Sequence, residues 1–230
     1  MIAYLAGLVA VQKPVDLTFR PALDAKAVYT LKRTYLDAEL EETTVLEDKL
    51  ELKVIQRDSR GPITVEWAWT PTGETLDGQT VPLPKDLKPW RVKEVRRANG
   101  SLLSRDENPD DPVTHFRLAR LLAPVLPPEP VLPGQDWTAE RAYEPGSEIP
   151  GWRSTSRLLG ITDAGGRSFA RVKGSFAEDG AASPMEGTFS AEIWISSGLL
   201  KALELKAKGA RIPGGEGRPQ TLKLELASLP

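Results

Sequence analysis

Alternation of apolar and polar residues is the feature that most constrains the fold of this 230-residue chain. Every second residue is apolar in the segments 50–54 (LELKV), 63–69 (ITVEWAW), 203–207 (LELKA) and 222–226 (LKLEL). Successive side chains of a β-strand point to opposite faces, so a period of two is typical of strands with one buried face. The pattern therefore predicts an all-β fold.

Short connections between the expected strands favour an antiparallel sheet, because parallel strands need long crossover connections. Residues 90–97 and 101–105 are typical of a hairpin, since Asn99-Gly100 between them can supply the positive φ values of a type I′ turn. Further strands, for a total of about ten or eleven, are expected near residues 28–35, 136–143, 152–162, 167–176 and 187–195.

One principal helix interrupts the strands. Asp111 is suited to the N-cap and Pro112 to the first helical position of a helix that runs to about Ala123. Its apolar side carries Phe116, Leu118, Ala119 and Leu122, and the opposite side carries Arg117 and Arg120. The helix is therefore expected to lie across the sheet.

The chain divides into an apolar segment, residues 1–12, and a single β-rich domain, residues 13–230. The first segment is too short to span a bilayer, and it is interpreted as the core of a secretory signal, although a basic n-region is missing. The alternative is an N-terminal strand or helix that docks on the fold.

A proline-rich connector after residue 124 separates two candidate halves, residues 13–124 and 134–230. The segments 29–35 and 137–143 share the pattern aromatic-Thr-x-x-Arg-x-Tyr. Two interpretations stay open at this point: duplication of a β-meander, and chance similarity between amphipathic strands.

Composition argues against several classes of function. The formal net charge is -2, so there is no basic excess for nucleic acid. Cysteine is absent and histidine occurs once, and no calcium-loop spacing is present, so neither a metal nor a cofactor is expected.

Catalysis finds little support among the reactive side chains. The single histidine, His115, falls on the apolar side of the expected helix, which favours a packed histidine over a general base. The carboxylate pairs Asp106-Glu107 and Asp110-Asp111 lie in a proline-rich loop, where such residues usually form turns and helix caps. The chain is therefore not expected to be an enzyme.

The six tryptophans are the most informative residues of the composition. Trp67 and Trp69 share one face of a strand, and aromatic side chains on a concave sheet can line an apolar cavity. Core packing is the alternative, and it is the favoured one. Trp194 has the opposite parity to its apolar neighbours, so it should face solvent, another element or a partner. The candidate binding residues are Trp67, Trp69, Trp90, Phe116 and Trp194.

The segment Phe116 to Trp137 (FRLARLLAPVLPPEPVLPGQDW) resembles a signature of exported bacterial proteins that form a domain-of-unknown-function family. Residues 187–192 and 197–200 are similar to that family's strand, turn and return strand. The resemblance implies a curved half-barrel wrapped around a helix, as in bacterial lipoprotein carriers, and it brings no catalytic residues. This chain departs from the exported form because it lacks a basic n-region and a lipobox cysteine.

The expected function is an extracytoplasmic, periplasmic or secreted, non-catalytic binding or carrier module that holds an apolar or amphipathic ligand between the sheet and the helix. The first alternative is a structural or protein-interaction domain whose core is filled by its own side chains, and the second is a hydrolase. The expected partner is an apolar small molecule, a lipid or another envelope protein, without nucleic acid and without a transmembrane span.

Overall fold

The computed structural model describes residues 13–58, 61–106, 112–143, 149–180, 183–211 and 220–228, with the backbone alone for residues 112–115. These residues form twelve strands and one helix. The elements are β1 Lys26–Asp37, β2 Glu42–Arg57, β3 Ile63–Leu76, β4 Gln79–Thr80, β5 Trp90–Arg96, β6 Leu102–Arg105, α1 Pro112–Leu121, β7 Asp136–Arg141, β8 Gly151–Ala164, β9 Arg167–Asp179, β10 Glu186–Trp194, β11 Leu200–Ala210 and β12 Gln220–Ser228.

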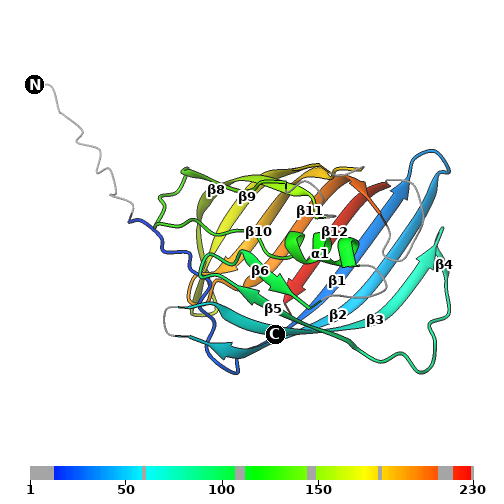
Figure 1. The fold of residues 1–230 in the computed structure, drawn as a ribbon, viewed down its shortest axis with the longest axis horizontal. Helices are drawn as coiled ribbons and strands as arrows, with labels where there is room; N and C mark the ends of the chain where they lie inside the picture. Colours follow the sequence, from blue (N-terminus) through cyan, green and yellow to red (C-terminus); the bar gives the residue numbers. More distant parts are fainter. Residues whose placement is uncertain are drawn as a thin grey trace, which may run out of the picture.

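All strands belong to one antiparallel sheet with the order β6-β5-β3-β2-β1-β12-β11-β10-β9-β8-β7, and β4 pairs with β3. The sheet curves into an open half-barrel, and the helix α1 lies within the curve (Figure 1). Strands β6 and β7 are the two edges, so the barrel is not closed there. The prediction of an all-β fold with one principal helix and a curved antiparallel sheet is confirmed.

Both candidate halves contribute to this sheet, and they meet where β1 pairs with β12. Tyr29 lies opposite Ser228, and Tyr35 lies opposite Leu222. The first half thus runs from the centre of the sheet to the β6 edge, and the second half runs from the β7 edge back to the centre.

The alternation in the sequence sets which side of each strand is buried. In β1, Tyr29, Leu31 and Tyr35 face inward and are at most 2% exposed, while Thr30 and Lys32 between them are exposed. A shift of register by one residue would place these three large side chains in water, so burial of one face fixes the register.

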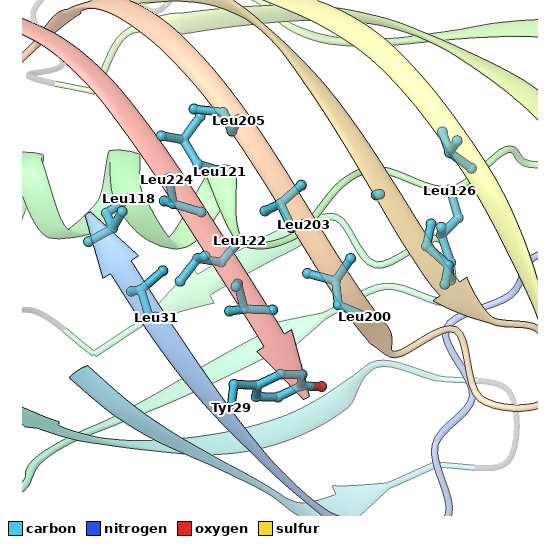
Figure 2. Packing of buried hydrophobic residues seen from close by; sticks show 14 of the residues in the cluster. Tyr29, Leu31, Leu118, Leu121, Leu122, Leu126, Leu200, Leu203, Leu205 and Leu224 are labelled. Atoms are coloured by element: carbon cyan, nitrogen blue, oxygen red, sulfur yellow. The ribbon is translucent and has the colours of Figure 1, made fainter. Parts of the chain in front are cut away.

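The helix fills the inside of the curve. Leu118, Leu121 and Leu122 pack against inward-facing leucines of β1, β11 and β12, among them Leu31 and Leu203 (Figure 2). Burial of one leucine side chain stabilises the folded state by about 1.5–3 kcal/mol, so this contact holds the helix inside the sheet. The helix has ten residues, and no helix in the described part of the chain is long and apolar enough to cross a bilayer.

The hairpin of β5 and β6 forms as predicted, but its turn is not of type I′. Gly100 has a φ of 78°, whereas Asn99 is not among the residues with positive φ. The Asn99 side chain instead accepts hydrogen bonds from the backbone N and the Oγ of Ser101, at 3.1 and 2.7 Å. This local bond stabilises a turn in which only the glycine adopts the left-handed conformation.

The turn between β10 and β11 requires a glycine for two reasons. Gly198 has a φ of 71°, which side chains other than glycine rarely adopt. A Cβ atom at this position would also lie 2.4 Å from the carbonyl oxygen of Thr18 and 2.7 Å from the Cα of Phe19. The chain segment that precedes β1 therefore packs directly on this turn.

Candidate functional site

Two arginines of the helix α1 are buried, which corrects the prediction that they lie on a polar side. Arg117 and Arg120 are only 7% and 8% exposed. Both contact Glu178 of β9, whose side chain is fully buried. A charge inside a protein needs a partner, and the inward-facing Glu178 supplies one on the side of the helix opposite its apolar residues.

Glu178 is bound from several directions. Arg117 Nη2 and Arg120 Nη2 each lie 2.5 Å from one of its carboxylate oxygens, and the backbone N of Met185 donates to Oε2 at 2.9 Å. Arg120 Nη1 also donates to the carbonyl oxygen of Pro150 at 3.0 Å. Two guanidinium groups share one carboxylate, so this cluster carries a net positive charge.

A second buried carboxylate lies near the other edge of the sheet. Glu94 of β5 accepts a hydrogen bond from Trp67 Nε1 at 2.8 Å and from Arg96 Nε at 3.0 Å. Arg105 Nε lies 3.6 Å from the same carboxylate. Burial lowers the pKa of Arg105, and the nearby charge of Glu94 opposes this shift.

A third buried pair joins β1 and β2. Arg33 Nη2 and Nε donate to Asp48 Oδ2 at 2.6 and 3.1 Å. Burial raises the pKa of Asp48, and the Arg33 guanidinium opposes this shift. The interior of the half-barrel thus contains three buried ionic clusters, centred on Glu178, Glu94 and Asp48, beside its apolar side chains.

Within the described part of the chain, two small cavities lie between the helix and the sheet. One cavity there has a volume of about 30 Å³ and is bordered by Tyr29, Leu52, Trp67 and Leu122 among others. A second cavity, beside Tyr35 and Arg117, has a volume of about 20 Å³. Each has room for about one or two water molecules and is far smaller than the ligand sites of proteins, which measure about 300–1,000 Å³.

A larger hollow lies where the barrel is open. A groove of about 480 Å³ separates the hairpin of β5 and β6 from the edge strand β7, with the C-terminal part of α1 and the following connector in its wall. Its lining residues are Arg97, Asn99, Ser101, Leu102, Leu103, Phe116, Arg120, Ala123, Val125, Leu126, Pro128, Thr138, Ala139, Glu140, Arg141 and Trp152. We call this hollow the seam groove.

Aromatic and cationic side chains meet at the β7 side of the seam groove. The Arg120 guanidinium lies 4.8 Å from the ring centroid of Trp152 and 5.6 Å from that of Phe116, and the Arg141 guanidinium lies 5.9 Å from Phe116. Trp152 in turn stacks on Phe176 at 4.7 Å. Burial lowers the pKa of Arg120; Glu178 opposes this shift, and the positive charges of Arg117 and Arg141 add to it.

The fold does not gather the five predicted binding residues in one hollow. Phe116 lines the seam groove, whereas Trp67 borders the small interior cavity. Trp69 is buried and packs against Trp90, with ring centroids 5.9 Å apart. Trp194 packs on Phe169 at 5.8 Å and lies outside the residues that line these hollows, which agrees with its opposite parity.

The seam groove contains functional candidates that sequence reasoning did not select. Trp152 was visible as one of the six tryptophans, but the sequence does not show that its strand lies beside the helix. Arg120 was expected on the side of the helix opposite the apolar residues. Because the groove is formed by residues from both halves of the chain, its composition depends on how the two sheet edges approach one another.

The residues considered for catalysis lie mostly outside the described part of the chain. This holds for Glu107, Asp110, Asp111 and the side chain of His115. Asp106 is described, and its carboxylate accepts a hydrogen bond from the backbone N of Lys93 at 3.3 Å. Within the described ranges, no three acidic or histidine side chains gather in a way that could hold a metal ion.

Comparison with known proteins places the chain near two solved structures of similar layout. The hypothetical lipoprotein YmcC from Escherichia coli (K12) matches with a TM-score of 0.36 and 13% identity, over 91% of this chain and 88% of that chain. A Bacteroides fragilis NCTC 9343 protein with a YmcC-like fold, described as a candidate exported protein, matches with a TM-score of 0.35 and 11% identity, over 94% of this chain and 100% of that chain.

No family model matches the chain, and no curated protein matches it significantly. The two solved structures are those of proteins described as a hypothetical lipoprotein and as a candidate exported protein. At such identities and TM-scores the likeness concerns the layout of the chain, and we base no functional argument on it.

Proposed function

We propose that this protein is a non-catalytic binding module for an apolar or amphipathic small molecule, and that the seam groove is its site. The observation that carries the proposal is the contrast in volume: about 480 Å³ at the open seam against about 30 Å³ between helix and sheet. The first volume lies within the range of ligand sites in proteins, and the second does not.

The lining of the seam groove fits such a ligand. Leu102, Leu103 and Leu126 contribute apolar surface, and Phe116 and Trp152 contribute aromatic surface. Leu103 is 39% exposed although it is a large apolar side chain, so a ligand that covers it removes apolar surface from water. Polar side chains of the lining, among them Asn99, Ser101 and Thr138, would fix the orientation of the ligand.

A structural or protein-interaction role is the alternative, and the filled interior favours it. A core of buried side chains that includes Trp67, Trp69 and Leu224 leaves little room inside the half-barrel. In that case the seam groove would have no small-molecule ligand, and the protein would bind no apolar probe.

We further propose that the protein acts outside the cytoplasm. The support is the apolar character of residues 1–12, which is that of a secretory signal core. The non-catalytic assignment rests on the scarcity of reactive side chains. Hydrolytic turnover that is lost in His115→Gln, while the melting temperature stays unchanged, would contradict it.

Binding of a fluorescent fatty-acid probe tests the site. In Ala139→Trp, a bulky ring is placed on the lining of the seam groove. In Ala227→Trp, the same ring is placed at an exposed position of β12 and serves as the matched control. We expect the wild type and the control to bind the probe and Ala139→Trp to lose binding. Equal binding by all three proteins would place the ligand elsewhere, and no binding by the wild type would favour the structural alternative.

A further inference from the structure

We infer that the seam groove selects an amphiphile with an anionic head group, a single-chain carboxylate, over its neutral and cationic counterparts. This inference rests on the proposed function, because it names the class of ligand for the same site. It is carried by the charges that line the groove and by buried N–H groups that have no acceptor.

The charges of the lining are unequal. Three arginines, Arg97, Arg120 and Arg141, line the groove together with one acid, Glu140. Arg97 and Arg141 are exposed and come from opposite sides, the hairpin of β5 and β6 and the strand β7. Glu140 lies 3.7 Å from Arg153, which is not among the lining residues. The groove therefore presents two exposed cations, Arg97 and Arg141, which we call its rim, beside the apolar side chains of its lining.

The buried charge below the rim has the same sign. Arg117 and Arg120 share the single carboxylate of Glu178, so one positive charge stays uncompensated within this cluster. An uncompensated charge in a region of low dielectric attracts an anion more strongly than a surface charge does. A carboxylate in the seam groove would supply the missing negative charge.

Two N–H groups of the lining lack acceptors. Arg120 Nε and Trp152 Nε1 are buried and have no hydrogen-bond partner within the described residues. Arg120 as a whole is only 8% exposed, so solvent does not readily supply the acceptor. A buried donor without an acceptor is costly, and a ligand oxygen that reaches these groups would remove that cost.

The remaining surface sets the shape of the ligand. Leucines from β6 and from the connector, together with Phe116 and Trp152, provide an apolar wall. This apolar wall can contact the hydrocarbon chain of the ligand, whereas the arginines of the groove can bind its anionic head group. A small inorganic anion would use the rim and leave the wall uncovered.

A set of twelve-carbon amphiphiles tests the inference. Dodecanoate, dodecanol and dodecylammonium have the same chain and differ in the charge of the head group. Each is titrated below its micelle concentration against the protein loaded with the fluorescent fatty-acid probe. Inorganic phosphate and monododecyl phosphate separate the contribution of the anion from that of the chain.

The expected result for the wild type is displacement by dodecanoate at about tenfold lower concentration than by dodecanol, as one charge-assisted hydrogen bond would give. Dodecylammonium should be weaker than dodecanol. In Arg141→Gln and in Arg97→Gln the preference for dodecanoate should shrink, and Arg171→Gln, an exposed arginine on β9 outside the groove, is the control of equal charge change. The preference should also fall as salt is raised.

The outcomes separate this inference from the proposed function. Equal displacement by dodecanoate and dodecanol would overturn the anionic selection and leave the groove as an apolar site. A preference for dodecanoate that persists in both groove variants would also overturn it. If inorganic phosphate displaced the probe as strongly as monododecyl phosphate does, the alkyl chain of the ligand would not be bound. A wild type that binds neither probe nor amphiphile would overturn both proposals.

Discussion

Arg120 Nη2 of the helix α1 lies 2.5 Å from Glu178 Oε1 of the strand β9, although 58 positions separate the two residues in the sequence. The side chains are 9% and 0% exposed, so this contact is made almost entirely out of water. The helix is therefore tied to the second half of the sheet by a buried ionic contact as well as by apolar packing.

Removal of the charge at Glu178 should destabilise the protein strongly. Glu178→Gln leaves Arg117 and Arg120 buried without a carboxylate, and breaking a buried ion pair on one side typically costs about 3–5 kcal/mol. The measurement is the free energy of unfolding in urea. Glu204→Gln, at an exposed position of β11, is the control and should change this free energy by less than about 0.5 kcal/mol. An equally small effect at Glu178 would show that the cluster contributes little.

Replacement of Trp67 distinguishes the filled interior from the seam groove. Trp67→Ala removes a ring that is 5% exposed and the donor to Glu94, and it should lower the free energy of unfolding by about 3–5 kcal/mol. Because Trp67 does not line the seam groove, the affinity for the fatty-acid probe should stay unchanged once unfolded protein is accounted for. A selective loss of affinity would indicate that the ligand lies between helix and sheet.

The turn at Gly198 should tolerate no side chain. Gly198→Ala places a Cβ against the backbone of Thr18 in addition to the unfavourable φ. We therefore expect the free energy of unfolding, measured by thermal unfolding, to fall by about 2–4 kcal/mol. Gly78 has a similar φ of 77° with no atom within 4 Å of an added Cβ. Gly78→Ala should therefore lower the free energy of unfolding by only about 1 kcal/mol. Equal losses in the two variants would mean that the contact with Thr18 is easily relieved.

The proposed export predicts a processed N-terminus. In the native host, Edman sequencing or mass spectrometry of the N-terminal peptide should show a protein that begins at or after Val11, because a signal core is removed on secretion. Fractionation of the cells provides the control for location. Intact Met1 in the cytoplasmic fraction would contradict the proposal.

The strands were predictable because their signal is local. Period-two alternation shows directly which side chains of a segment are buried. It located the strands around residues 50–54 and 222–226 without knowledge of the strands that pair with them. The hairpin at Asn99-Gly100 was predictable for the same reason. Its turn type was not, because the Asn99 side chain bonds to Ser101 instead of following the usual preference.

The buried carboxylates have a signal in the sequence. Glu178 has the parity of Val172 and Phe176, and Glu94 has the parity of Val92 and Arg96, so both carboxylates occupy inward-facing positions. A charged residue at such a position predicts a buried partner of opposite sign. The identity of the partner could not be predicted, because it depends on where the helix lies in the half-barrel.

Pairing of β1 with β12 makes the centre of the sheet the last part that can form during synthesis. Tyr29 leaves the ribosome early, yet its neighbour Ser228 follows only after every other strand has been made. Contacts between positions so distant close a long loop of chain and raise the contact order, which slows folding. Until β12 arrives, the inner edge of β1 offers unpaired N–H and C=O groups to any other extended chain. A shortened protein that lacks β12 would thus be an aggregation hazard, and not a smaller version of the same fold.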